Sequence, residues 1–219
     1  MNRGNRMRIL FFDMEFADGK VPGSVYSLGY VVTDGNFKIR KKATDILINP
    51  ESSWNQYVQK NILAYPIEEV NAAPAFPAHY KRIKRLFDRA DVVVGFAIGN
   101  DVTALRKDCL RYQLPLLEYK YFDTELLCRL MGDYPRARGL AKCVEAWCGK
   151  IPDNQHRSDG DALATMRLLR AICRAKHATV DMIMEAYPEC CGSTYPKTKK
   201  QSKRKKFAFL RVFKRKSKK

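Results

Sequence analysis

Residues 7–16, MRILFFDMEF, are the stretch from which the fold of this 219-residue chain can be predicted. The segment is rich in β-branched, aromatic and apolar residues, a composition typical of a strand. Because side chains alternate along a strand, Asp13 and Glu15 share one face with Ile9 and Phe11. The other face is apolar throughout, with Leu10, Phe12, Met14 and Phe16. The sequence therefore predicts an interior strand with two acids at its carboxyl end.

The two acids of this strand have two interpretations. Carboxylates placed two residues apart on one face repel each other, and partial burial increases the cost. A divalent cation that prefers oxygen ligands, Mg²⁺ or Mn²⁺, would relieve both effects. Alternatively, the strand simply ends in water, where Asp13 and Glu15 would be ordinary surface residues. The pair alone leaves both possibilities open.

The segments that follow predict the rest of the sheet. Residues 24–33 and 37–48 form a second and a third strand around the turn Asp34-Gly35-Asn36, a hairpin signal. Residues 92–95 and 119–123 form two more strands, and the first of these shows no alternation, as expected of a strand covered by helices on both faces. Helices are expected at 78–89, 100–112, 124–131, 139–148 and 158–176. This order predicts an α/β domain with a mixed five-stranded sheet, three antiparallel strands then two parallel ones, flanked by helices.

Composition and charge restrict the class of protein. Hydrophobic residues make up 46% of the chain, which excludes wholesale disorder. The longest apolar stretch, residues 92–99, is too short for a membrane span, and the ILFF run near the start is too short for a signal peptide. Seven cysteines, an odd number, indicate reduced thiols. We therefore expect a cytoplasmic protein.

The net charge of +18 is concentrated at the end of the chain. Residues 197–219 hold 13 of the 41 Lys and Arg and no acid, so the remaining residues hold 28 cations and 23 acids, or about +5. We expect a domain over residues 1–190 and a basic tail over 191–219 that is disordered when unbound. The tail would bind nucleic acid, an acidic protein or an anionic membrane, or act as a nuclear or nucleoid address.

Three further residues are candidates for a site. Asp101 follows the apolar strand, at the carboxyl end where open α/β sheets bind ligands; in the alternative, Asn100 caps the next helix and Asp101 favours its dipole. His156 lies in a polar loop five residues before Asp161, and a histidine there titrates near neutral pH. The alternative for Asp161 is a capping box with Ser158.

The order and spacing of these residues resemble one family. A D-x-E on the first strand, an acid after the fourth and an H-x4-D at a late helix resemble the DEDDh 3′–5′ exonucleases of the ribonuclease H-like fold, over residues 7–176. LAYPIEEVNAAPAF at 63–76 and Asp123-Thr124 also look like family segments. Position 157 is Arg, which excludes the branch of the family with Tyr-x3-D. One departure is Ser158, where the family has alanine. The matching site residues are Asp13, Glu15, Asp101, His156 and Asp161.

The resemblance implies an activity and a mechanism. The protein would hydrolyse single-stranded DNA or RNA from a 3′ end to nucleoside 5′-monophosphates, with two Mg²⁺ or Mn²⁺ ions held by the four acids. His156 would act as the general base. Phe16 and Phe96 would contact the terminal base, although ordinary core packing explains both as well. The alternative function is a catalytically inactive nuclease fold that binds nucleic acid or tethers a complex.

Overall fold

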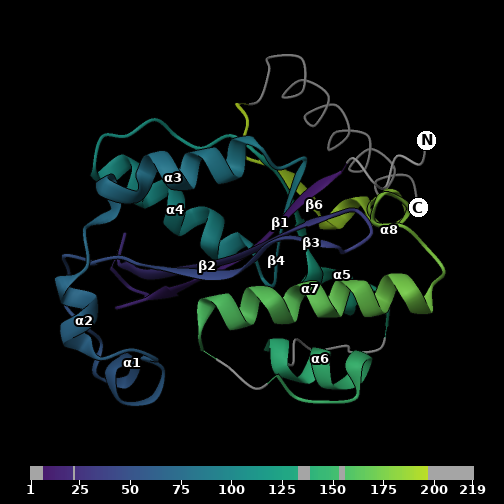
Figure 1. The fold of residues 1–219 in the computed structure, drawn as a ribbon, viewed down its shortest axis with the longest axis horizontal. Helices are drawn as coiled ribbons and strands as arrows, with labels where there is room; N and C mark the ends of the chain where they lie inside the picture. Colours follow the sequence, from purple (N-terminus) through teal and green to yellow (C-terminus); the bar gives the residue numbers. More distant parts are fainter. Residues whose placement is uncertain (1–6, 22, 133–138, 153–155, 197–219) are drawn as a thin grey trace, which may run out of the picture.

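The computed structural model describes residues 7–21, 23–132, 139–152 and 156–196 (Figure 1). Its centre is a mixed sheet of six strands in the order β3-β2-β1-β4-β5-β6. The strands are β1 (Arg8–Phe16), β2 (Val25–Asp34), β3 (Ile39–Leu47), β4 (Val92–Gly95), β5 (Lys120–Asp123) and β6 (Cys191–Ser193). The predicted strand order is confirmed: β1 to β3 are antiparallel, and β4 and β5 run parallel to β1.

The predicted sheet of five strands is one strand short. β6 pairs antiparallel with β5 through Cys191, Gly192 and Ser193. Three residues around a glycine carry no strand pattern of their own, so the pairing with β5 defines this strand. It lies just beyond the boundary predicted at residue 190, within the segment assigned to the tail. Residues 194–196 of that segment are also described, and the backbone N–H of Thr194 donates to the carbonyl of Tyr119 at 3.0 Å. The remaining part of the predicted tail, residues 197–219, lies outside the described residues.

Helices and strands alternate over residues 76–130, and further α-helices follow before β6. The helices are α1 (Gln56–Asn61), α2 (Ile67–Ala72), α3 (Phe76–Asp88), α4 (Gly99–Arg111), α5 (Thr124–Leu130), α6 (Gly139–Cys148), α7 (Ser158–Ala175) and α8 (Val180–Ala186). The five predicted helices correspond to α3 to α7 within about two residues. The short helices α1, α2 and α8 were not predicted. None of the helices in the described segments is long and apolar enough to cross a bilayer.

The alternation in β1 divides the core into two layers. Leu10, Phe12 and Met14 pack with the apolar residues of α3 and α4 on one face of the sheet. Ile9 and Phe11 pack on the opposite face with those of α5, α6 and α7. Figure 1 shows α7 lying along this side of the sheet. Since Asp13 and Glu15 continue the Ile9 and Phe11 face, the two acids emerge on the side of the sheet that α7 covers.

Gly29 of β2 allows α7 to begin close to these acids. In the register of the sheet Gly29 is the partner of Asp13. A Cβ atom at Gly29 would lie 1.9 Å from the carbonyl carbon of Ser158, the first residue of α7. Only a residue without a side chain permits such a close approach. The first turn of α7, which carries Asp161, is therefore held directly over the carboxyl end of β1.

Candidate active site

Three of the predicted acids meet at one point. Asp13 and Glu15 of β1 and Asp161 of α7 each offer a carboxylate oxygen, and these oxygens lie within 4.8 Å of one another. All three side chains are half-buried. Residues far apart in the sequence are thus brought together by the packing of α7 against the sheet.

Burial and mutual repulsion dominate the electrostatics of this cluster. Burial, followed by the charge of Asp101 and then that of Glu15, raises the pKa of Asp13 well above its usual value. Burial and the charge of Asp161 raise the pKa of Glu15 to about 8. Burial also raises the pKa of Asp161 to about 6, although His156 lowers it in part. Without a counter-charge, these acids resist being ionised together.

Asp101 borders this cluster from another element. It lies in the first turn of α4, just after β4, and is only 5% exposed. Its pKa is raised by burial, then by the charges of Glu15 and Asp123. α4 starts at Gly99 with Ile98 as the N-cap and no side-chain cap bond, so the alternative in which Asn100 caps the helix is wrong.

His156 lies beside Asp161 at the entrance to α7. Its backbone N–H donates a hydrogen bond to Oδ2 of Asp161 at 3.1 Å, and its side chain is exposed. The backbone of His156 is in the left-handed region, with a φ of 64°, which is uncommon for a residue other than glycine. The hydrogen bond therefore fixes both the loop and the carboxylate, and the imidazole is open to solvent.

The capping box suggested for Ser158 and Asp161 does not form. Arg157 is the N-cap of α7 and makes no side-chain cap bond. The Ser158 hydroxyl instead donates to Oδ1 of Asp45 on β3 at 2.7 Å. The side chain of Asp161 is thus left to face Asp13 and Glu15.

Asp45 is a residue near the site that the sequence interpretation missed. Three hydroxyl groups donate to its carboxylate: Ser27 to Oδ1 at 2.6 Å, Ser158 to Oδ1, and Tyr65 to Oδ2. The hydroxyl oxygens of Ser27 and Ser158 also lie next to each other, and both hydroxyl protons are directed at Asp45. The charge of Asp45 contributes to the raised pKa values of Asp13 and Glu15. The one sequence signal was Ser158, the departure from the family's alanine.

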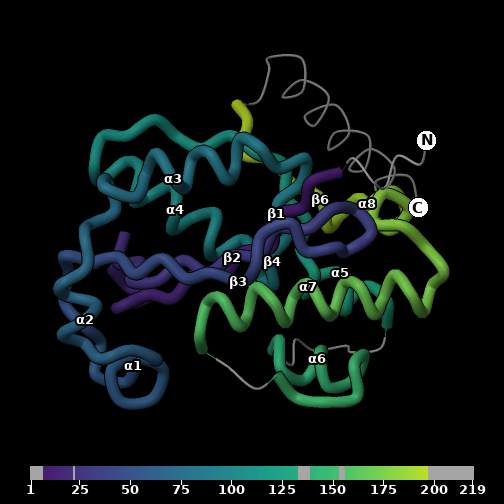
Figure 2. The backbone as a smooth tube through the Cα atoms, viewed as in Figure 1, coloured from purple at the N-terminus to yellow at the C-terminus, as the bar shows by residue number. Residues whose placement is uncertain are grey.

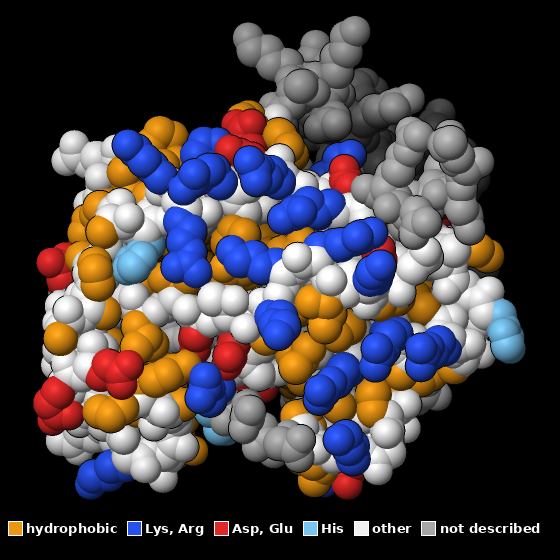
Figure 3. All heavy atoms as spheres, viewed as in Figure 1, with side chains coloured by type: hydrophobic (Ala, Val, Ile, Leu, Met, Phe, Trp, Pro, Cys, Tyr) orange, Lys and Arg blue, Asp and Glu red, His pale blue; other side chains and the backbone are white. Residues whose placement is uncertain are grey.

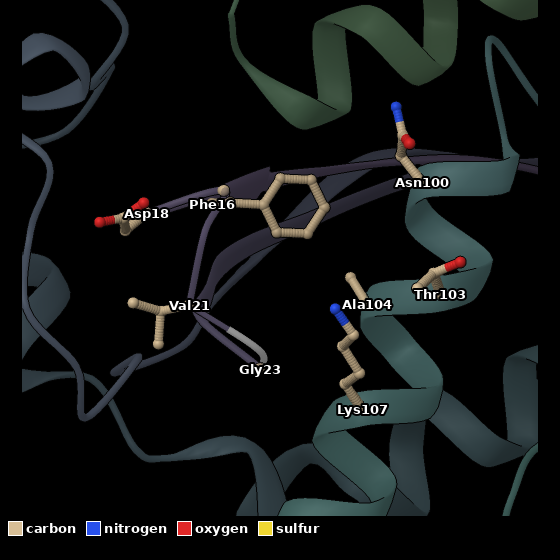
Figure 4. A pocket seen from close by; sticks show the side chains of 9 residues that line it. Phe16, Asp18, Val21, Gly23, Asn100, Thr103, Ala104 and Lys107 are labelled. Atoms are coloured by element: carbon tan, nitrogen blue, oxygen red, sulfur yellow. The ribbon is translucent and has the colours of Figure 1, made fainter.

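The two candidate aromatic residues lie in different surroundings. Phe16 lines a cavity of about 350 Å³ between the loop after β1 and α4, together with Asn100 and Lys107. Figure 4 shows the Phe16 ring projecting toward α4 and the Lys107 side chain extending toward the same space. Phe96 is half-buried and packs against the core layer of α5 to α7. Core packing accounts for Phe96, whereas Phe16 borders an open space.

The donor set fits a divalent cation. The cluster of Asp13, Glu15 and Asp161 consists of carboxylate oxygens, the ligands that Mg²⁺ and Mn²⁺ prefer. Burial is the main cause of the raised pKa values of Glu15 and Asp161, and the charge of Asp161 further raises the pKa of Glu15. A bound cation would favour the ionised form of both acids. The residues of the cluster come from two elements, the end of β1 and the start of α7.

The fold and the acids at the end of its central strand are those of an exonuclease of the ribonuclease H-like class. The chain belongs to the RNase_T exonuclease family, whose model matches residues 10–169. This confirms the resemblance to the DEDDh-type 3′–5′ exonucleases and the prediction of an enzyme. The family depends on divalent metal ions. No curated protein matches the chain by sequence.

Solved structures share this fold at low sequence identity. The nuclease domain of 3′hExo, a DEDDh family member bound to rAMP, is 14% identical over 77% of this chain and 92% of its own, with a TM-score of 0.64. A 3′-exonuclease that recognises the histone mRNA stem-loop is 14% identical over 78% and 84%, with a TM-score of 0.63. Exonuclease X with 5′ overhanging duplex DNA is 17% identical over 82% and 98%, with a TM-score of 0.59.

Proposed function

We propose that this exonuclease removes nucleoside 5′-monophosphates from the 3′ end of single-stranded DNA or RNA, with two Mg²⁺ or Mn²⁺ ions at the acids described above. The observation that carries the proposal is the group of carboxylates of Asp13, Glu15 and Asp161 within 4.8 Å. Asp101, buried beside them, completes the set of four acids. Relatives in the same fold, with rAMP, a stem-loop RNA or overhanging DNA, support a nucleic-acid substrate with a 3′ end.

Each residue has a task in this mechanism. Asp13, Glu15 and Asp161 would hold one ion, and Asp101 would support the second beside Asp13. When bound, the ions supply the positive charge that neutralises the scissile phosphate and lowers the pKa of water. The exposed imidazole of His156 takes the proton from the attacking water, and its backbone N–H keeps Asp161 in place. Phe16 offers a face to the terminal base at the rim of its cavity.

A labelled-oligonucleotide assay tests this function. Purified protein is incubated with 5′-labelled single-stranded RNA or DNA and Mg²⁺ or Mn²⁺, and the ladder of shortened products is followed together with the released mononucleotides. Asp13→Ala should abolish hydrolysis, and His156→Ala should reduce kcat by about 10²–10⁴-fold. Asp181→Ala, which changes an exposed acid in the first turn of α8, is the matched control and should retain activity.

Two results would contradict the proposal. Hydrolysis that is unaffected by Asp13→Ala or by removal of the metal would show that the acids do not form the active site. Salt-sensitive binding of oligonucleotides without any turnover would instead support the alternative of an inactive binding protein.

A further inference from the structure

Several segments of the chain carry cations and no acid, and two of them are neighbours in the fold. Residues 35–44, GNFKIRKKAT, contain Lys38, Arg40, Lys41 and Lys42. Residues 162–178, the part of α7 after Asp161 and the turn behind it, contain Arg167, Arg170, Arg174 and Lys176. The chain without residues 197–219 is only mildly basic. These segments are therefore more positively charged than the rest of that part of the chain.

The two segments lie side by side in the fold. The turn between β2 and β3 borders the last turns of α7, as the path of the chain in Figure 2 shows. Between them is an open cavity of about 460 Å³, lined by Asn36 and Phe37 on one side and by Arg170, Arg174 and His177 on the other. Figure 3 shows Lys and Arg side chains gathered over α3, β3 and α7 on this face. We call residues 35–44 and 162–178 together the β3–α7 surface.

The β3–α7 surface begins at the acids. α7 starts over Asp13, where Ser158 meets Asp45, and then runs mainly along β1 and β2, with fewer contacts to β3. From Asp161 to Arg174 the helix advances about 20 Å, which is the span of several nucleotides. Arg170 also lies roughly half a turn round the helix from Asp161, so a polymer whose 3′ end reaches the carboxylates would pass around α7 as well as along it to reach the cavity.

Protection of a sheet edge explains only part of this pattern. β3 is an edge strand, and lysines on such a strand prevent it from pairing with another chain. That role accounts for Lys42 but not for the arginines of α7. Lys41 lies over the ring of Tyr30 at 4.8 Å, on the face of the sheet that α3 covers. One cation is also neutralised locally, because Arg40 is paired with Asp34 at 2.8 Å. The arginines at the cavity, Arg170 and Arg174, are the part of the surface that edge protection leaves unexplained.

We propose that the β3–α7 surface holds the sugar–phosphate backbone of a single-stranded substrate upstream of its 3′ end, with phosphates at the cavity beside Arg170, Arg174 and His177. This inference rests on the proposed function, because it concerns the same substrate. Contacts from arginine to phosphate are independent of base sequence and sensitive to salt. The enzyme should therefore act faster on oligonucleotides long enough to reach the cavity than on very short ones, whatever their sequence.

Substrate length is the variable that tests this inference. We compare kcat/KM of the full chain on a dinucleotide and on a dodecamer, with the wild type and with Arg170→Gln/Arg174→Gln. The variant should lose about five- to tenfold in kcat/KM on the dodecamer and stay within about twofold on the dinucleotide. The slope of log kcat/KM against log salt for the dodecamer should become shallower by about 0.7 for each phosphate that the variant no longer neutralises.

A charge-matched control lies near the other edge of the sheet. Arg106→Gln/Lys120→Gln removes two exposed cations from α4 and the start of β5, and should change neither rate. Residues 197–219 are identical in all these proteins, so their charge cancels in the comparison. A second variant, Lys42→Gln, should also lose rate on the dodecamer. If light scattering shows that it self-associates and its rate is unchanged, edge protection is the role of that lysine.

The outcomes separate this inference from the proposed function. If the wild type hydrolyses both substrates and the α7 variant loses no more on the dodecamer than the control variant, the inference is overturned and the function stands. If the wild type hydrolyses neither substrate, the proposed function is wrong. Fluorescence anisotropy with a labelled dodecamer in EDTA then measures whether the β3–α7 surface binds the oligonucleotide. Equal affinity for the α7 variant and the control variant would overturn the inference in that case as well.

Discussion

Asp45 is a negatively charged residue in a place where negative charge is already in excess. It is the partner of Gly29 in the sheet, as Asp13 is on the other side, so only one strand separates the two acids. A carboxylate there is stabilised because hydroxyl groups occupy its oxygens, and those groups come from β2, α7 and the loop before α2. Asp45 therefore joins three parts of the chain behind the carboxylates, and we predict that it acts as a positioning residue.

Asp45→Asn should separate this positioning role from a purely structural one. Asparagine keeps the size of the side chain but removes its charge. Its amide N–H₂ group also replaces one carboxylate oxygen, so a hydroxyl that donates to that oxygen in the wild type loses its acceptor. We expect kcat/KM to fall about 10- to 100-fold, as for other groups that orient metal ligands. Because the charge of Asp45 contributes to the raised pKa of Glu15, the pH profile of metal binding should move to lower pH.

A buried acid elsewhere in the sheet is the control for this change. Asp34 is buried at the end of β2 and paired with Arg40. Asp34→Asn should lower the melting temperature without shifting the pH profile. If Asp45→Asn behaves in the same way, Asp45 has no role beyond folding.

The site residues differ in how far the sequence could predict them. Asp13, Glu15, Asp101, His156 and Asp161 were predicted from the resemblance of their order and spacing to the family pattern. The structure brings carboxylate oxygens of three of them within 4.8 Å of one another, with the other two adjacent. Asp45 could not be predicted, because its relation to Asp13 exists only in the register of the sheet. An isolated acid in IRKKATDIL has the pattern of an ordinary edge-strand residue.

At the scale of elements, the first turn of α7 determines whether the site assembles. The helix is the longest in the described structure and packs on both β1 and β2. Its start is fixed by contact with Gly29 and by the bond from Ser158 to Asp45. Asp161 therefore reaches the acids of β1 only while the helix keeps this close approach.

Gly29→Ala should disrupt that approach. The new methyl group would lie 1.9 Å from the carbonyl carbon of Ser158 and 2.0 Å from the nitrogen of Asp159, so backbone rather than a flexible side chain must move. We expect a loss of about 1–3 kcal/mol in the free energy of unfolding. Because a displacement of about 1 Å at a catalytic group costs about 10²-fold, kcat should fall by at least that factor.

Thermal denaturation and the oligonucleotide assay measure the two effects, with Gly99→Ala as the matched control. Gly99 is in the first turn of α4, and a Cβ there meets nothing within 4 Å. The control should keep both stability and kcat. A Gly29→Ala protein with unchanged kcat would mean that the start of α7 does not need this contact.

The elements that the sequence failed to predict are the short ones. α3 to α7 carry enough turns for an apolar period to be recognised, and the first three strands carry alternation or a hairpin turn. α1 and α2 have six residues each and β6 has three. Helices of that length are not stable by themselves, so tertiary contacts rather than local sequence decide where they form.

At the scale of the whole molecule, the site acts against the stability of the fold. Asp13, Glu15, Asp101 and Asp161 all have raised pKa values, and burial is the largest cause for each. A raised pKa in the folded state means that folding favours the protonated acid. The stabilising contribution is complete below the unfolded value, near 4, and is lost as pH rises through the folded value.

The metal-free protein should therefore become less stable as pH rises from about 4 to 8. Asp161 titrates at about 6 and Glu15 at about 8, so the decline continues through neutral pH. A divalent cation binds the ionised form and should reverse the decline. At a free concentration of about 100 times the Kd, the gain is about 2.7 kcal/mol, which corresponds to roughly 5–10 °C in Tm for a chain of this size.

Thermal unfolding between pH 5 and pH 8, in EDTA and in Mg²⁺ or Mn²⁺, measures both effects. The stabilisation by metal should be small at pH 5, where the acids are protonated, and large at pH 8. Asp13→Asn removes a charge from the centre of the cluster, so its metal-free form should melt above the wild type at pH 8 and respond weakly to metal. A wild type whose Tm is independent of metal at pH 8 would contradict the assignment of these carboxylates as the ligands, because ions held there must stabilise the folded state.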